Sequence, residues 1–157
     1  MSSPKSASRT ALSAVTADTA VTSLLTIETF GRGFIDLTGE VKKFIRDACA
    51  REGVVTLFIR HTSASLTIQE NADPTVLVDL MTALDRLAPE NAGWRHDAEG
   101  PDDMPAHVKS MLTASSLHIP VLERELALGT WQAIYLIEHR RRPHRREIVL
   151  QFVGKTG

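Results

Sequence analysis

The chain has 157 residues, of which 18 are Lys or Arg, 19 are Asp or Glu, six are His and one is Cys. This length predicts a single domain, and 43% hydrophobic with 24% charged residues is typical of a globular protein. A formal net charge of −1 gives no reason to expect nucleic acid or an anionic membrane as a partner. One cysteine excludes an intrachain disulfide and a thiolate-rich metal site, so any site of borderline ligands has to use the histidines.

The N-terminal residues 1–20 differ in composition from the rest of the chain. They are rich in Ser, Thr and Ala, and they lack the apolar core of a secretory signal. A transit peptide has a similar composition, but a disordered tail is favoured. No stretch reaches the roughly 18 consecutive apolar residues of a membrane span. We therefore expect a disordered tail at 1–20, one domain at 21–157 and a cytoplasmic protein.

The first half of the chain predicts four strands and two helices. Alternating and β-branched residues predict strands at 21–30, 34–37, 54–61 and 64–70. The first helix is expected to be capped by Thr38 and to run to about Arg51, where Gly53 ends it. The second helix is expected to begin at Asp73 as its cap, with Pro74 in its first turn.

The second half begins with a long connection. Residues 88–104 show no periodic pattern and contain many turn formers, which is typical of a functional or disordered loop. A short helix capped by Asp103 should follow. Strands are expected at 115–122, 130–139 and 147–153, with a hairpin turn at 140–145. The order ββαββααβββ predicts a single α+β domain with a mixed or antiparallel, barrel-like sheet on which the helices pack.

Three histidines lie where they can take part in chemistry. Strand periodicity places His61 and Glu70 each at the end of an apolar strand face, either as a solvated strand end or aimed into a polar site. The segment 94–107 contains His96 and His107 with several carboxylates. These carboxylates are Asp97, Glu99, Asp102 and Asp103. The imidazoles and carboxylates can form a metal site, to which His61 would add a third imidazole. The alternative is a solvated acidic loop whose Asp103 only caps the helix.

The other polar features have ordinary interpretations. The remaining histidines are His118, His139 and His144. We expect each of these to be structural or solvated. The five arginines within 140–146 form either a solvated turn or an anion site for phosphate, pyrophosphate or a nucleic-acid backbone. Nucleic acid is the weaker alternative, because no aromatic residues are interleaved for base stacking. Thr62 and Ser63 next to His61 do not favour a serine hydrolase, because adjacent strand residues face opposite ways.

Four segments together resemble motifs of the YjbQ family. They are HTSASLTIQENADPTV at 61–76, HDAEGPDDMPAH at 96–107, SSLHIPV at 115–121 and GTWQAIYLIEHR at 129–140. Proteins of that family are often labelled secondary thiamine-phosphate synthases, an activity that joins a pyrimidine pyrophosphate to a thiazole phosphate and releases pyrophosphate. The resemblance runs from about residue 21 to 154, and it implies a compact α+β domain that assembles as a homotrimer with sites near the subunit boundaries.

The resemblance also implies the residues of the site. The implied ligands of a divalent metal, with zinc expected, are His61, His96 and His107. The implied catalytic residues are Glu70, Asn71 and Asp73, with Glu70 as the general base. The expected substrate-binding residues are Thr62, Ser63, Gln132 and Arg140. Gln132 belongs to the Trp-Gln pair of the resemblance, whereas Arg140 is expected from its charge, which can add to phosphate binding. A metal ion held by neutral imidazoles would attract the oxyanions of a phosphorylated small-molecule substrate.

Three functions follow from this sequence. The first is a metal-dependent enzyme that acts on phosphorylated or pyrophosphorylated small molecules, with thiamine-phosphate synthesis as the named example. The second is a metal-dependent hydrolase with an unrelated substrate, and the third is a non-enzymatic trimer that binds a metal or an anion. The combination of histidines with carboxylates favours the two enzymes, and no sequence feature separates them.

Overall fold

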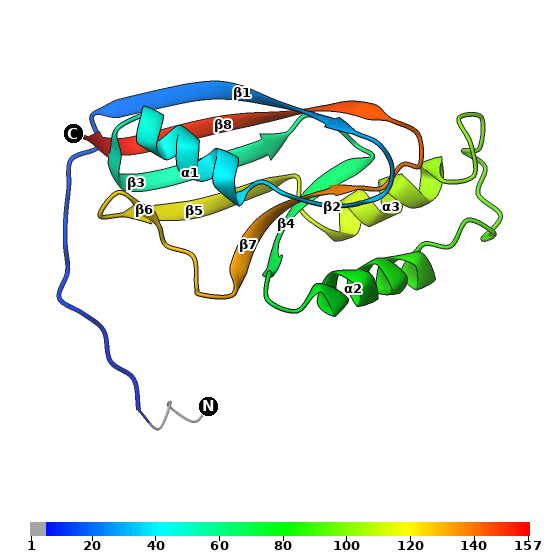
Figure 1. Ribbon diagram of the computed structural model, residues 1–157, viewed down its shortest axis with the longest axis horizontal. Coiled ribbons are helices and arrows are strands. Elements are labelled where there is room, and N and C mark those ends of the chain that lie inside the picture. The colour runs from blue at the N-terminus through cyan, green and yellow to red at the C-terminus, as the bar shows by residue number, and fades with distance from the viewer. Residues whose placement is uncertain (1–5) are drawn as a thin grey trace.

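A computed structural model describes residues 6–157, which form three helices and two sheets (Figure 1). The strands are β1 (Thr19–Thr29), β2 (Gly33–Asp36), β3 (Ala50–Ile59), β4 (Ala64–Glu70), β5 (Ser116–Leu122), β6 (Glu125–Leu126), β7 (Gln132–Glu138) and β8 (His144–Thr156). The helices are α1 (Thr38–Asp47), α2 (Pro74–Leu87) and α3 (Asp103–Leu112). The prediction of a single α+β domain is confirmed, with one strand, β6, that was not expected.

The predicted N-terminal tail lies partly outside the described residues. Residues 1–5 are in that part, whereas residues 6–18 are exposed and form no helix or strand. Strand β1 then begins at Thr19, two residues before the predicted start. None of the helices within residues 6–157 combines the length and the apolar character needed to cross a membrane.

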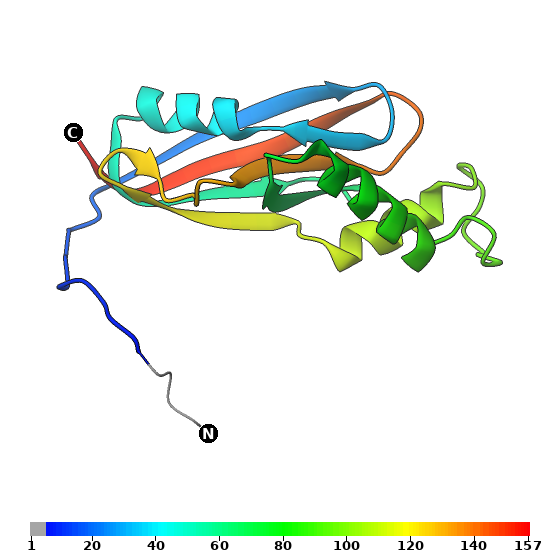
Figure 2. The same cartoon turned by 60° about the horizontal axis from the view of Figure 1, so that its bottom comes forward.

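The two sheets are antiparallel throughout. The larger sheet has the order β1-β8-β3-β5-β6, and the smaller sheet has the order β2-β7-β4. Helix α1 covers one face of the larger sheet, and α2 and α3 lie on the side of the smaller sheet (Figure 2). The antiparallel alternative of the prediction therefore holds, since every strand pair in both sheets is antiparallel.

The hydrophobic core lies between the inner face of the larger sheet and a layer formed by α1 and the smaller sheet. The buried apolar side chains of β3 are Val55, Leu57 and Ile59, and they pack with Val41 and Ile45 of α1. The opposite face of this sheet is uncovered. Its large exposed apolar side chains are Leu24, Val54, Phe58, Leu122 and Val153. Strand β3 is central, as predicted, but the helices cover only one of its two apolar faces.

Helix α1 ends earlier than predicted. Its last residue is Asp47, Cys49 adopts a positive φ of 52°, and β3 begins directly afterwards. Thr38 does not cap the helix; its hydroxyl accepts the N–H of Ile134 at 2.9 Å. Gly53 lies within β3, where an added Cβ would come within 2.3 Å of the Val153 carbonyl oxygen. This glycine therefore allows β3 and β8 to approach each other and does not end a helix.

The two remaining helix starts show one correct and one wrong prediction. The Asp73 carboxylate accepts the N–H of Thr75 at 2.9 Å, with Pro74 as the first residue of α2, so the predicted cap is confirmed. The cap position of α3 is Asp102, and it makes no side-chain capping bond. Asp103 is the first residue of α3, so the prediction that it caps this helix is wrong, and its carboxylate has other partners.

Candidate metal centre

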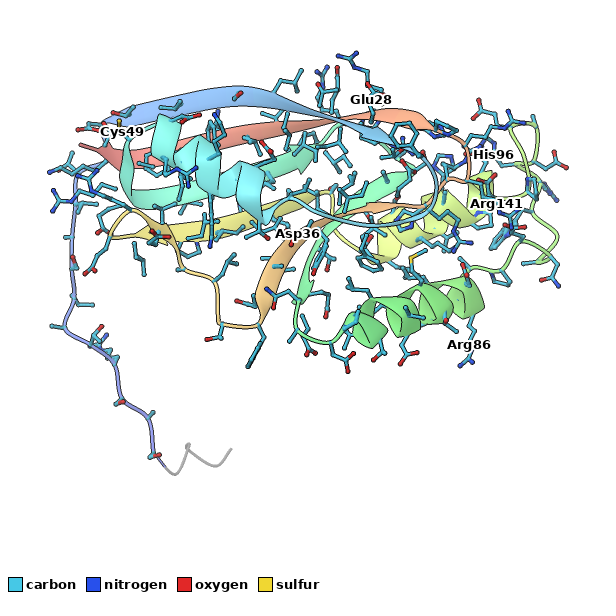
Figure 3. The ribbon with its side chains drawn as sticks, in the orientation of Figure 1. Glu28, Asp36, Cys49, Arg86, His96 and Arg141 are labelled. Atoms are coloured by element: carbon cyan, nitrogen blue, oxygen red, sulfur yellow. The ribbon has the colours of Figure 1, made fainter. Side chains whose placement is uncertain are left out.

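The candidate centre forms where the long connection of residues 88–102 enters α3. The connection contains no helix or strand and carries His96, which lies in the same region of the molecule as Arg141 (Figure 3). Asp103 and His107 are four residues apart at the start of α3, so their side chains lie on the same face of the helix. The helix thus supplies two groups, and the preceding connection folds back to bring the third.

Three possible metal ligands lie together at this point. The Nε2 atom of His96 lies 2.7 Å from Oδ2 of Asp103, and Nε2 of His107 lies 3.5 Å from Oδ1 of the same carboxylate. One ligand atom from each of the three residues lies within 4.8 Å of the others. A single cation bound at about 2.0–2.2 Å from nitrogen and oxygen fits between groups this close.

The backbone selects the tautomer of a neutral His107 ring. Its Nδ1 lies 2.9 Å from the carbonyl oxygen of Thr62. Because a carbonyl oxygen only accepts hydrogen bonds, Nδ1 donates, and in the neutral ring the lone pair is then on Nε2, the nitrogen nearer Asp103. A histidine that binds a metal is commonly oriented by such a carbonyl.

Asp103 gives the test of whether a cation fits. Only 1% of this residue is exposed, and among the described residues its Oδ2 atom has no hydrogen-bond partner, although His96 Nε2 is 2.7 Å away. A buried carboxylate oxygen without a partner is unfavourable, and a cation shared with the two imidazoles would remove that cost. The residues present therefore fit a divalent metal ion.

Arg140 holds the two aspartates in place. Its guanidinium donates to Asp103 Oδ1, to Asp102 Oδ2 at 3.2 Å and to the carbonyl oxygen of Glu99 at 2.9 Å. Burial alone would raise the pKa of Asp102, but the N–H of Arg141 and the charge of Arg140 outweigh it and lower that pKa. Arg140 was expected to bind substrate. Only 5% of this residue is exposed, and its guanidinium is engaged by carboxylates instead.

His61 lies outside the group of three. Its Nε2 accepts the backbone N–H of Glu147 at 2.8 Å, and its Nδ1 lies 3.5 Å from Arg146. Burial lowers the pKa of His61, and the charge of Arg146 lowers it further. The group of possible ligands in the structure therefore consists of two histidines and Asp103, not of the three expected histidines. His61 is not part of it, and its Nε2 atom already accepts a backbone N–H.

A pocket of about 240 Å³ lies between His61 and the centre. It is lined by His61, Thr62, Ala64, His107, Ser110, Met111 and Ser115. Thr62 of the expected substrate-binding set therefore lines this pocket. Ser63, another member of that set, accepts bonds from Arg146 Nη2 through its carbonyl oxygen at 3.3 Å and its hydroxyl at 3.1 Å.

The expected catalytic residues lie at the other end of β4. This strand begins at Ala64, beside the centre, and its seven residues reach Glu70 roughly 20 Å away at about 3.3 Å per residue. Glu70 is opposite Gln132 on β7, and the N–H of Asn71 donates to the Trp131 carbonyl at 3.0 Å. Within one chain, Glu70 is therefore too far away to be the general base of this centre.

The remaining residues of that end have structural partners. Asp73 caps α2, and the Gln132 side chain accepts the N–H of Gly129 at 2.8 Å. The structure thus gathers Glu70, Asn71, Asp73 and Gln132 around one end of the smaller sheet. Asp103 was one of the carboxylates that the sequence placed near a metal site, but it was not part of the expected ligand set. Its spacing of four residues from His107 at a helix start is the signal that could have identified it as a ligand.

Fold and centre together define an antiparallel α+β domain with a candidate metal site of two histidines and one aspartate. A model of the YjbQ-like UPF0047 family matches residues 23–155. The chain belongs to this family.

Individual relatives agree with this assignment. The UPF0047 protein sll1880 of Synechocystis is 46% identical over 85% of this chain and 91% of its own length. The UPF0047 protein YjbQ of Escherichia coli O157:H7 is 41% identical over 83% of this chain and 96% of its own length. The names of these relatives state the family and no activity.

Solved structures share the fold. The hypothetical protein APE1520 of Aeropyrum pernix superimposes with a TM-score of 0.79 at 26% identity, over 86% of this chain and 99% of that one. A YjbQ/UPF0047 family protein of Clostridium acetobutylicum gives a TM-score of 0.72 at 34% identity, over 84% of this chain and 98% of that one.

Proposed function

We propose that this chain binds one divalent metal ion, with zinc expected, and acts as a metal-dependent enzyme on phosphorylated small molecules. The observation that carries the proposal is the buried carboxylate of Asp103, placed between His96 and His107 with one oxygen unpartnered among the described residues. Two nitrogens and one oxygen resemble the ligand sets of catalytic zinc sites, which keep one position open. When bound, such an ion supplies a Lewis acid for phosphoryl oxygens or an activated water.

The surrounding side chains support an oxyanion substrate. Arg140 balances one of the two negative charges of the buried Asp102 and Asp103, and a divalent ion would outweigh the remaining one. The third carboxylate paired with Arg140, that of Glu99 at 3.8 Å, is 72% exposed and therefore screened by solvent. His96 is half exposed, which leaves the centre open to solvent on that side. A positive, open centre attracts phosphate and pyrophosphate, the groups that both substrates of thiamine-phosphate synthesis carry.

The first test is the metal content of purified protein by elemental analysis. We expect about one zinc ion per chain, strong depletion in His107→Ala, and an unchanged content in the control His118→Ala, whose side chain is exposed on β5. His61→Ala should also keep its metal, because His61 lies outside the group. Metal-free wild type after supplementation with zinc would contradict the proposal.

The second test is activity with a pyrimidine pyrophosphate and a thiazole phosphate. The proposal predicts product formation by the zinc-loaded protein and its loss in His107→Ala. Release of phosphate without the joined product would identify the hydrolase alternative. Metal binding with neither reaction would leave the non-enzymatic alternative.

We also propose that the chain assembles as a homotrimer, as its resemblance to the family implies. The uncovered face of the larger sheet supports this, because its five large apolar side chains are each between 40% and 55% exposed. Contiguous apolar surface of this kind marks association sites. Light scattering after size exclusion should give three times the chain mass of 17.3 kDa, and Phe58→Glu should reduce it. A wild-type monomer would contradict this proposal.

A further inference from the structure

We propose that a second site, formed by Arg32 and Arg141, binds a phosphate group of the ligand. Arg32 lies in the turn between β1 and β2, and Arg141 lies in the turn between β7 and β8. Both line a pocket of about 220 Å³, together with Asp85, Ala88, Pro89 and Glu90. Pockets for drug-sized ligands have roughly 300–1,000 Å³, so this pocket suits a single phosphoryl group better than a larger molecule.

The charges around this pocket do not balance. Arg32 and Lys109 both bind Oδ1 of Asp85, the second at 2.6 Å, and Arg141 pairs with Glu90 at 2.5 Å. Three cations against two carboxylates leave one positive charge without a partner in this cluster. An anion bound here would balance this remaining positive charge.

The unused hydrogen-bond donor has the right chemistry for an oxyanion. Within the part of the chain that the structure describes, Nε of Arg32 is buried and has no acceptor. A guanidinium carries its donors in a fixed planar fork that matches the oxygens of phosphate. A buried N–H without an acceptor is rare in folded proteins. Because this Nε is buried, a phosphate reaches it only if the Arg32 side chain turns toward the pocket, and that movement would give the donor the acceptor that it lacks.

A buried neighbour reports the same positive potential. His139 lies near enough to Lys109 and Arg32 to be affected by their charges, and its pKa is lowered to about 3. Burial is the main cause, and the charges of Lys109 and Arg32 lower this pKa further, against the opposing effect of Glu138. Lys109 and Arg32 thus disfavour a further positive charge near them, as expected beside an anion site.

The pocket adjoins the candidate metal centre. Glu90 also lines a neighbouring pocket of about 390 Å³ to which His96 contributes. The backbone N–H of Arg141 donates to Asp102 at 2.9 Å. The link between the two sites rests on the proposed function. A ligand with two anionic groups would place one group at the metal and the other between Arg32 and Arg141.

Glu90 is the natural competitor for the anion. It occupies Arg141 through an ion pair in which the side chain of Arg141 is 57% exposed. Exposed ion pairs contribute little to stability, so a phosphate can displace the Glu90 carboxylate at small cost. Removal of the Glu90 charge should therefore strengthen binding of the anion, which is the opposite effect to removal of either arginine.

The test is a ³¹P NMR titration of the full-length, metal-free protein with inorganic phosphate at low salt. We expect Arg141→Gln to weaken binding about tenfold, since hydrogen bonds to charged groups contribute on that scale. Arg32→Lys should also weaken binding although it keeps the charge, because lysine has no Nε–H group. Glu90→Gln should strengthen binding several-fold.

Arg142→Gln is the matched control, because Arg142 lies on the same turn, is exposed and does not line the pocket. It should change the affinity for phosphate by less than twofold. Equal weakening by Arg142→Gln and Arg141→Gln would overturn the site in favour of diffuse attraction, and so would absence of binding in metal-free wild type. Phosphate binding by a protein that takes up no metal would leave this site standing while the metal proposal fails.

Discussion

Arg146→Met should destabilise the fold by about 3–5 kcal/mol, because it leaves the Glu138 carboxylate buried without its cation. Glu138 is 0% exposed, and Arg146 donates to its two oxygens at 2.6 and 2.7 Å. The Thr29 hydroxyl and the N–H of Arg140 donate to the same carboxylate at 2.8 and 2.9 Å. Burial would raise the pKa of Glu138, but these donors outweigh it and lower that pKa, so the group is ionised in the fold.

Urea unfolding at pH 7 measures this loss. The control is Arg145→Met. The Arg145 side chain is 67% exposed and its pair with Glu28 is long, at 3.8 Å, so the loss of stability should stay below about 1 kcal/mol. Adding Glu138→Gln to Arg146→Met should recover part of the loss, because the buried charge is then removed. Equal urea midpoints for the two arginine variants would show that the buried pair contributes no more to stability than the exposed one.

The second large effect is a loss of stability in mild acid caused by His139. This residue is 1% exposed, with Nε2 2.8 Å from the Ser65 hydroxyl and Nδ1 unpartnered within residues 6–157. In the fold its pKa is about 3, whereas the unfolded side chain has the ordinary value of 6.5. Below pH 6.5 the unfolded chain therefore binds a proton that the folded chain does not, which costs about 1.4 kcal/mol for each pH unit down to about 3.

Chemical unfolding at pH 7 and pH 5 isolates this contribution when wild type is compared with His139→Gln. Wild type should lose about 2 kcal/mol more than the variant, because glutamine does not titrate. Glu138 adds little in this range, since its lowered pKa makes its contribution fall only below the unfolded value of 4.5. Parallel losses in both proteins would mean that His139 is protonated in the fold at pH 5.

Local patterns predicted those elements whose signals lie within a few residues. The alternation at 64–70 coincides with β4, and the Asp73-Pro74 pair begins α2. The end of α1 was not predictable in the same way. Gly53 is determined by its approach to β8, about 100 residues later in the chain, and a local rule assigns such a glycine to a helix end.

The candidate centre was predictable only in part. His107 and His96 were recognised as candidates, but the choice of Asp103 over His61 depends on contacts made across the chain. Arg140 anchors the aspartates from 37 residues away, and the Glu147 backbone occupies His61. Likewise, the arginine run of 140–146 looked solvated, yet Arg140 and Arg146 are buried because their carboxylate partners lie in the interior.

The three bonds of Arg140 have a consequence for how the centre would take up an ion. They attach the end of the 88–102 connection and the ligand Asp103 to the hairpin that begins at Arg140, so these groups are held in place before a metal binds. Little conformational entropy then remains to be lost on binding, and the favourable energy goes into affinity. The centre is thus preorganised, unlike the small zinc domains that are unfolded without their ion.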